Sequence, residues 1–322
     1  MISSYPRQLS AMLPRLRWLM LLAFFLAAGC LQAHDPAGEY DATPRLAIIS
    51  AFPPELQKLR NEAQITGERV INGRRHYVGK LAGHDVVLLL SGISMVNAAM
   101  TTQSLLDRFA VRQIIFSGIA GGVNPGLHVG DVTVPADWGQ YQEQVFARKT
   151  ADGWDQGPFP GEFPNYGMIF PHHVLVTRKD SEQPEKLFWF PADPEALKTV
   201  ERIAGGIRLS GHTSDEKQLS HMPRVVVGGH GVSGSTFVNN TEYRQWVWQS
   251  FQANALDMET AAVATVAYVN RVPFIAFRSL SDLAGGGEGK NDLPVFLKLA
   301  AENSATVVLA YLNALPPAAT AK

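Results

Sequence analysis

The sequence has little cysteine, little net charge and few long apolar runs. Its single cysteine cannot form a disulfide within the chain. Lysine and arginine number 28 against 29 acidic residues, a net charge of -1 that excludes the basic footprint of a nucleic-acid-binding protein. No internal repeat or low-complexity tract is present. The composition, 46% hydrophobic and 18% charged, is that of an ordinary globular protein.

The N-terminal segment has the layout of a signal peptide. Arg7, Arg15 and Arg17 precede an apolar run over residues 18–28, which is followed by small residues and Cys30. The run is about half of the ~20 residues that a permanent transmembrane helix needs, and no later segment is predicted to reach that length. We therefore expect the mature protein not to span a membrane.

The residues around the cysteine, Leu26-Ala27-Ala28-Gly29-Cys30, resemble a bacterial lipobox, although alanine stands where leucine is more usual. Two interpretations remain: lipidation of Cys30, or an ordinary cleaved signal or buried cysteine. The lone cysteine favours lipidation. Residues 1–30 are then a signal peptide and 31–44 a tether of a periplasm-facing lipoprotein in the bacterial cell envelope. Leu31 lacks the aspartate of inner-membrane retention, which favours the outer membrane, with membrane contact only through the anchor.

From residue 45 to 315 the pattern predicts one α/β domain, with a central mixed, largely parallel sheet flanked by helices. Asn72-Gly73 is a strong hairpin turn signal and Ala82-Gly83 a weaker one. The predicted strands cover 46–50, 86–90, 113–116, 129–135, 225–227, 255–258 and 274–277. The predicted helices cover 54–62, 97–109, 241–249, 260–270 and 293–312.

Residues 138–193 interrupt this alternation with a segment rich in aromatic residues, proline and glycine. A structureless loop of that length is unusual inside a compact domain, and so many aromatic residues are unusual in a disordered one. We expect an ordered insertion that covers the site or forms a subunit interface.

Three carboxylates follow predicted strands: Glu55, Glu259 and Asp282. Ligands bind at the carboxyl ends of strands in open α/β sheets. Each carboxylate also has an ordinary structural explanation. Glu55 and Glu259 fit the first turn of a helix, and Asp282 fits an Asx turn or helix cap.

Six sequence blocks carry a family resemblance. They are Ala51-Phe52-Pro53-Pro54-Glu55, Ser117-Gly118-Ile119-Ala120-Gly121-Gly122, Leu127-His128-Val129-Gly130-Asp131-Val132, Ser233-Gly234-Ser235-Thr236-Phe237-Val238, Asp257-Met258-Glu259-Thr260-Ala261-Ala262 and Arg278-Ser279-Leu280-Ser281-Asp282. In this order they resemble the methylthioadenosine/S-adenosylhomocysteine nucleosidases of the nucleoside phosphorylase and nucleosidase superfamily. The aromatic insertion resembles the branch of plant vegetative and bark storage proteins.

The resemblance implies a purine nucleoside substrate, hydrolysis of its N-glycosidic bond and no cofactor. Glu55 would hold and activate the attacking water, and Asp282 would protonate or hydrogen-bond N7 of the purine. Glu259 would bind the ribose hydroxyls. The remaining implied contacts are Met258 to the sugar, Phe237 and the backbone of Val238 to the base, and Arg278 and Ser281 to the water and the acid. A homodimer is also implied.

The chemistry requires such groups, because glycosidic cleavage develops positive charge on the sugar and negative charge on the base. An unperturbed aspartate, with a pKa near ~3.9, is ionised at neutral pH, so Asp282 needs a raised pKa to donate a proton.

Water is favoured over phosphate as the nucleophile. Related phosphorylases place arginine and serine where this sequence has Phe116 and Ile119, which cannot hold phosphate. Ile119 also replaces the serine usual in the nucleosidases, which leaves two alternatives open: a catalytically weak nucleoside-binding or storage-type protein, and a purine nucleoside phosphorylase. The sequence does not define the nucleoside or its 5′ substituent.

No metal site is predicted. The adjacent His172 and His173 are poorly placed to chelate one ion, and no third ligand has suitable spacing. Residues 285–291 resemble a phosphate-binding loop only superficially, because Ala284 and Asn291 break that pattern.

Overall fold

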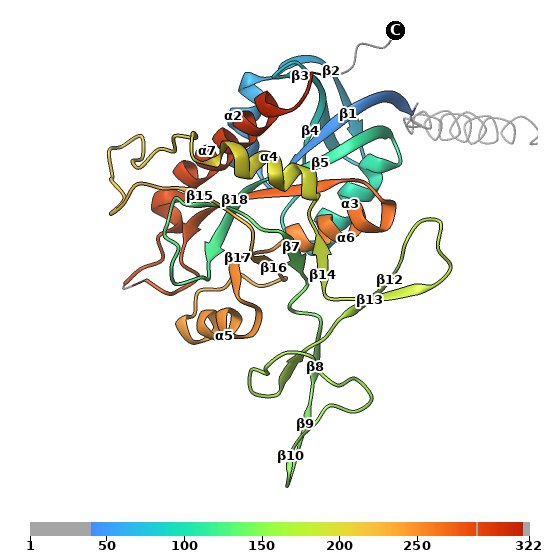
Figure 1. Ribbon diagram of the computed structural model, residues 1–322, viewed down its shortest axis with the longest axis vertical. Coiled ribbons are helices and arrows are strands. Elements are labelled where there is room, and N and C mark those ends of the chain that lie inside the picture. Colours follow the sequence, from blue (N-terminus) through green and yellow to red (C-terminus); the bar gives the residue numbers. More distant parts are fainter. Residues whose placement is uncertain (1–39, 288, 318–322) are drawn as a thin grey trace, which may run out of the picture. The chain divides into compact units, whose positions relative to one another are not determined.

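Twelve strands form one mixed sheet in the computed structural model, which describes residues 40–287 and 289–317 (Figure 1). The strand order is β14-β7-β16-β17-β5-β1-β4-β3-β2, and β18, β6 and β15 branch from β5. The predicted signal peptide, Cys30 and most of the predicted tether lie outside the described residues. The chain from Asp41 onward is one compact unit.

The sheet strands are β1 (Asp41–Ser50), β2 (Gln64–Ile71), β3 (Arg74–Leu81), β4 (His84–Leu90), β5 (Phe109–Gly122), β6 (Val132–Val134), β7 (Asp137–Gly139), β14 (Trp189–Pro191), β15 (Val225–Val227), β16 (His230–Ser233), β17 (Ala253–Asp257) and β18 (Phe274–Asp282). The helices are α2 (Pro53–Glu62), α3 (Met95–Leu106), α4 (Pro194–Ala204), α5 (Thr241–Phe251), α6 (Thr260–Asn270) and α7 (Leu293–Ala314).

The centre of the sheet is parallel, with β5 between β1 and β18, and β1 also pairing with β4. Helices cover both faces: α2, α4 and α7 pack on one, and α3 and α6 on the other. Strands buried on two faces need apolar side chains at nearly every position, which explains the continuous apolar runs. The predicted α/β fold with a mixed, largely parallel sheet is confirmed.

Both predicted hairpin turns are present, since Asn72-Gly73 joins β2 to β3 and Ala82-Gly83 joins β3 to β4. Asn72 and Ala82 have positive φ, as such tight turns require.

Three strands, β1, β5 and β18, are at least twice as long as predicted. β1 begins at Asp41 rather than at residue 46, because the Asp41 carboxylate accepts a hydrogen bond from Arg45 Nε at 3.0 Å and the Asp41 backbone N–H donates to the Arg108 carbonyl. β5 continues through the glycine-rich block, and β18 continues to Asp282, because these two segments pair with each other. Asp282 is therefore the last residue of a strand and does not follow one.

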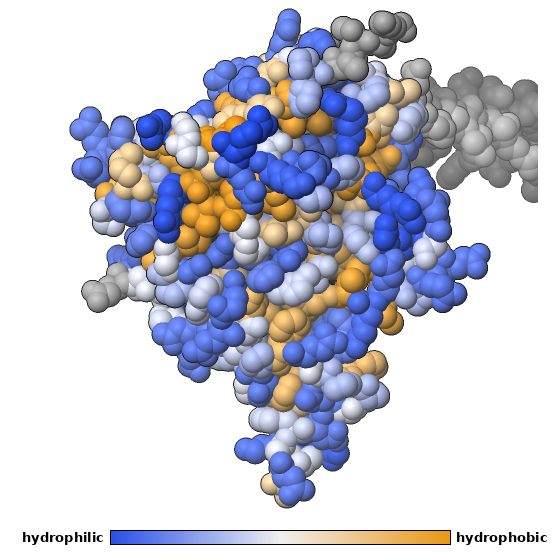
Figure 2. Space-filling model, in the orientation of Figure 1, coloured by the Kyte–Doolittle hydropathy of each residue, from blue (hydrophilic) through white to orange (hydrophobic). Residues whose placement is uncertain are grey.

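The aromatic segment forms three two-stranded hairpins between β7 and β14. They pair β8 (Gln144–Phe146) with β11 (Ile169–Pro171), β9 (Arg148–Thr150) with β10 (Gly153–Asp155), and β12 (Val174–Thr177) with β13 (Pro184–Leu187). Figure 1 shows them extending from the edge of the sheet, and Figure 2 shows a mostly polar surface there with scattered hydrophobic groups.

The predicted insertion, residues 138–193, includes parts of the main sheet, since it begins within β7 and ends after β14. Trp138 in β7 and Phe190 in β14 are fully buried in the core beside α6. Phe163 and Phe188 instead pack against Phe251 of α5 with ring centroids 5.0 and 5.4 Å apart. The aromatic residues thus anchor the base of the hairpins to the domain.

Helix α7 corrects the expectation that no segment after the signal peptide reaches the length of a span. Its 22 residues are long and apolar enough to cross a membrane, but 56% of the apolar window is buried against the rest of the protein. It packs against α2 and against strands β5 and β18 of the sheet, as the core helix of a globular domain does.

Candidate active site

A cavity of about 290 Å³ opens at the carboxyl ends of β1, β5, β17 and β18. Its walls include seven of the eight residues predicted for catalysis and substrate binding: Glu55, Phe237, Val238, Met258, Glu259, Ser281 and Asp282. The eighth, Arg278, is fully buried behind the wall. Five of the six sequence blocks therefore supply one site, or the layer beneath it, and the block Leu127–Val132 supplies no residue of the cavity wall.

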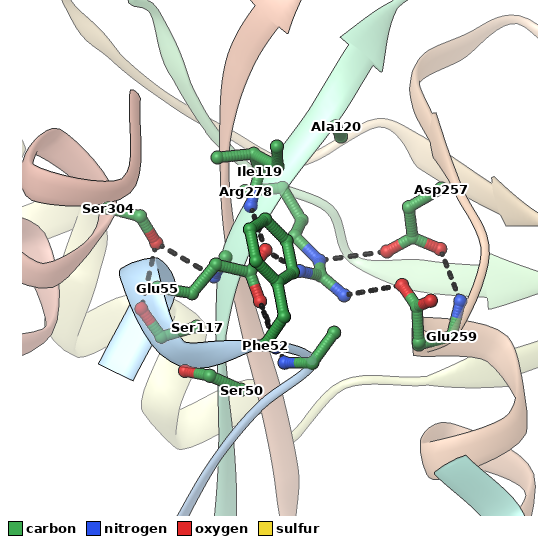
Figure 3. A network of polar contacts seen from close by, with 12 residues as sticks. Ser50, Phe52, Glu55, Ser117, Ile119, Ala120, Asp257, Glu259, Arg278 and Ser304 are labelled. Atoms are coloured by element: carbon green, nitrogen blue, oxygen red, sulfur yellow. Dashed lines mark hydrogen bonds and ion pairs between the residues drawn. The ribbon is translucent and has the colours of Figure 1, made fainter. Parts of the chain in front are cut away.

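Glu55 lies in the first turn of α2, which begins with two prolines whose missing N–H groups cost nothing there. One carboxylate oxygen accepts hydrogen bonds from the backbone N–H groups of Ala51 and Phe52, at 2.7 and 3.4 Å. The other accepts from the backbone N–H of Ile119 at 2.8 Å (Figure 3). Burial raises the pKa of Glu55, although Arg278 and these N–H groups oppose the shift.

Arg278 stands among three carboxylates (Figure 3). Its guanidinium nitrogens lie 2.8 Å from Asp257, 3.5 Å from Glu55 and 3.8 Å from Glu259. The guanidinium also lies over the ring of Phe116, 4.1 Å from its centroid. A fully buried arginine requires such charge compensation, so Arg278 and the carboxylates depend on one another.

Glu259 is the N-cap residue of α6, and its side chain turns toward the cavity. One oxygen accepts a hydrogen bond from the backbone N–H of Ser94 at 2.8 Å. Burial, with repulsion from Asp257, raises the pKa of Glu259 to about 7. A carboxylate here is suited to accept hydrogen bonds from hydroxyl groups of a ligand.

Asp282 ends β18 with its side chain buried at the cavity wall. It accepts hydrogen bonds from the backbone N–H of Ala284 at 2.8 Å and from the Ser281 hydroxyl at 2.9 Å. Burial raises the pKa of Asp282, and the hydrogen bonds counteract only part of that effect. A proton donor at neutral pH needs a pKa raised in this way.

The rest of the wall is mainly apolar. Phe237 is 53% exposed at the mouth, and Val238 is buried behind it. Phe52, Ile93, Leu293 and Leu297 add an apolar rim that was not predicted from the sequence. Their only signal was hydrophobicity, which most core residues share.

Two polar residues of the site were also missed. Asp257 caps α6 by accepting from the backbone N–H of Thr260 at 3.1 Å and binds Arg278 as well. Ser304 of α7 accepts from the Gly118 backbone N–H at 3.1 Å and lies 2.9 Å from the Ser117 hydroxyl. An ordinary helix-cap signature marked Asp257, and nothing local marked Ser304.

The comparisons with known proteins agree with this geometry. A family model described as the phosphorylase superfamily matches residues 45–313. The 5′-methylthioadenosine/S-adenosylhomocysteine nucleosidase of Tolumonas auensis is 32% identical over 84% of this chain and 100% of that protein. The same enzyme of a Geobacillus species is 33% identical over 84% of this chain and 99% of that protein.

Solved structures give the same result. The Neisseria meningitidis nucleosidase in complex with methylthio-immucillin-A has a TM-score of 0.62 at 27% identity, covering 84% of this chain and 99% of its own. The Streptococcus pneumoniae nucleosidase with a transition-state inhibitor has a TM-score of 0.62 at 26% identity, covering 84% and 100%. The chain therefore belongs to the phosphorylase superfamily, within which it resembles the methylthioadenosine/S-adenosylhomocysteine nucleosidases.

Proposed function

We propose that this protein hydrolyses the N-glycosidic bond of an adenosine-type purine nucleoside and releases the free base. The observation that carries the proposal is one cavity with two buried carboxyl groups of raised pKa, Glu55 and Asp282, on its walls. The nucleosidase relatives support the same activity.

The reaction divides between the two carboxyl groups. Glu55, ionised, accepts a proton from a water molecule whose oxygen forms a bond to C1′ of the ribose. The bond between C1′ and N9 breaks, and its electron pair goes to the purine, which takes the proton of Asp282 at N7. Glu259 accepts hydrogen bonds from the ribose hydroxyls and stabilises positive charge on the sugar.

Water is a better nucleophile than phosphate for this cavity. None of the described residues that line it is a lysine or arginine, and Arg278 is engaged by carboxylates behind it. Phosphate binding requires cationic and hydrogen-bonding groups. The ionisable groups that line the cavity are instead the carboxyl groups of Glu55, Asp257, Glu259 and Asp282, and those that are ionised repel phosphate.

Ile119 does not remove the contact that holds Glu55. The Ile119 backbone N–H donates to that carboxylate, whichever side chain the residue carries. This contact argues for retained turnover and against the storage-type or binding-only alternative.

The apolar rim favours a substrate with an apolar 5′ substituent. Ile93, Leu293 and Leu297 would lose contact area against a 5′-hydroxyl and gain it against a methylthio group. We therefore expect methylthioadenosine to be hydrolysed with a higher kcat/KM than adenosine.

The test incubates the purified full-length chain with adenosine, inosine, methylthioadenosine and S-adenosylhomocysteine, with and without phosphate, and measures free base. We expect base release without phosphate. Asp282→Asn should lower kcat by about 100-fold or more, because it removes the acid. The exposed Asp152→Asn is the matched control. Dependence on phosphate, with ribose 1-phosphate as product, would indicate a phosphorylase, and tight binding without release a binding protein.

A homodimer is the assembly that we propose. Val96 and Met100 are 75 and 50% exposed and lie one helical turn apart on α3, and Ile93, 52% exposed, lies in the loop just before that helix. An exposed apolar stripe of this kind favours a protein–protein contact. Ile93 also lines the cavity, so a partner on this stripe would lie beside the substrate.

The cell location that we propose is the periplasmic side of the bacterial envelope, through a lipid on Cys30. The basic segment, the short apolar run and the lone cysteine support it. Mass spectrometry of Cys30 and fractionation of cells test it. Cys30→Ser should move the protein from the outer-membrane fraction to the soluble fraction, and an unmodified Cys30 in the wild-type protein would contradict the proposal.

A further inference from the structure

Three metal-ligating side chains converge outside the substrate cavity. His128 and Asp131 lie in the turn between β5 and β6, and His221 precedes β15. One ligand atom from each lies within 4.8 Å of the others. Segments far apart in the sequence meet here because β6 and β15 pair in parallel, which brings their N-terminal ends together.

Asp131 is the fixed centre of this cluster. Its carboxylate is fully buried and accepts hydrogen bonds from the backbone N–H groups of His128 and Arg224, at 3.0 and 2.9 Å. Its oxygens also lie 3.5 Å from His221 Nε2 and 3.9 Å from His128 Nδ1. A buried carboxylate needs a cationic partner to offset its lost hydration.

His221 is left without hydrogen bonds by the described part of the chain. Both of its ring nitrogens are buried, and neither has a hydrogen-bond partner among those residues. Its ring lies beside that of His128, with centroids 4.3 Å apart and planes inclined by 45°. Two imidazoles and a carboxylate therefore share one small space without a complete network of hydrogen bonds.

We infer that His128, Asp131 and His221 bind a divalent first-row transition metal ion such as Zn²⁺. Imidazole nitrogen with carboxylate oxygen is a donor set that suits these ions. Metal–ligand bonds of about 2.0–2.2 Å place neighbouring ligand atoms roughly 3.4 Å apart in a tetrahedral site. The distances of 3.5 and 3.9 Å are close to this, and the His128 side chain, 55% exposed, can turn to complete the fit.

The ion would brace the strand that carries the proposed acid. Leu280 of β18 exchanges backbone hydrogen bonds with Gly130 and Asp131, at 2.7 and 2.8 Å. Asp282 follows two residues later on the same strand. None of the three ligands lines the substrate cavity, so the role of the ion is structural and not catalytic.

The test uses the full-length chain in detergent, without a histidine tag and stripped with a chelator. Titration with Zn²⁺ should give one site per chain, and Co²⁺ should give the visible absorption of a nitrogen- and oxygen-ligated ion. His128→Ala and His221→Ala should each weaken Zn²⁺ binding by at least about tenfold and abolish the Zn²⁺-dependent rise in Tm.

The matched control is His212→Ala, which removes an exposed histidine of the same segment outside the cluster. It should bind Zn²⁺ as the wild type does. Absence of stoichiometric binding to the wild-type chain would overturn the inference. Equal Zn²⁺ affinity in His128→Ala, His221→Ala and His212→Ala, or an equal loss of Zn²⁺ affinity in all three, would also overturn the inference. The Co²⁺ spectrum of the intact chain keeps the test valid should a variant not fold.

Discussion

Glu259 and Asp282 illustrate how burial changes the chemistry of single residues. Each follows or ends a strand. Glu259 had an ordinary explanation as a carboxylate in the first turn of a helix, and Asp282 as an Asx turn or helix cap. Glu259 is indeed the N-cap residue of α6, yet its side chain makes no capping hydrogen bond and faces the cavity. Asp257 caps the helix in its place. Glu259 therefore lies at the start of the helix, and the capping hydrogen bond comes from a neighbouring residue.

The raised pKa of Glu259 predicts a pH dependence of stability. The folded chain holds this proton up to about pH 7, whereas an unperturbed glutamate releases it near pH 4.5. Between these values the folded state binds more protons than the unfolded state, so the free energy of unfolding falls as pH rises. Glu259 contributes at most about 3 kcal/mol to this fall.

Denaturation by urea between pH 4.5 and 7.5 measures the effect. Glu259→Gln should remove part of the decline, because glutamine does not titrate, while the exposed Glu201→Gln should leave it unchanged. Identical pH profiles for Glu259→Gln and the wild type would show that Glu259 ionises in the folded chain at its ordinary pKa.

At the scale of the elements, β5 and β18 pair in parallel and place the glycine-rich block beside Arg278. Gly118 lies opposite Arg278 in this register. A Cβ atom at Gly118 would lie 2.0 Å from Arg278 Nη1 and 2.3 Å from Glu55 Oε1. The glycine is therefore required for the close approach of the two charged groups.

Gly118→Ala should abolish hydrolysis and destabilise the fold by about 1–3 kcal/mol, because the added methyl group separates Glu55 from Arg278. Activity assays and thermal denaturation measure both effects. Gly205→Ala, where no atom lies within 4 Å of the new Cβ, is the control and should keep both properties. An active Gly118→Ala enzyme would show that this ion pair is dispensable.

At the scale of the whole molecule, the exposed stripe on α3 predicts the oligomeric state. Val96→Lys should convert the proposed dimer into a monomer, because it places a charge in an apolar contact. Sedimentation velocity measures the oligomeric state of the variant. Val70→Lys, at a 55% exposed position on β2, is the control and should leave the dimer intact. A wild-type monomer, or a Val96→Lys dimer, would contradict the assignment of this interface.

The sequence alone determined the fold class, both hairpin turns and seven of the residues that line the cavity. These features follow from local patterns: apolar runs of strand length, helical periodicity, turn chemistry and six short blocks. The resemblance carried the roles of Glu55, Asp282 and Glu259, which hydrophobic periodicity cannot assign. Glu55 in particular lies in a first turn that is also an ordinary place for a carboxylate.

Only the tertiary structure decided which distant groups meet. The packing of helices on the sheet determines three features of the site. They are the position of Arg278 among three carboxylates, the contact of Ser304 with Gly118 and the apolar rim. The lengths of β5 and β18 depend on their mutual pairing, and the His128, Asp131 and His221 cluster depends on that of β6 and β15. These contacts join segments that are far apart in the sequence and follow no periodic spacing. Tertiary packing determines such contacts, and local propensity does not.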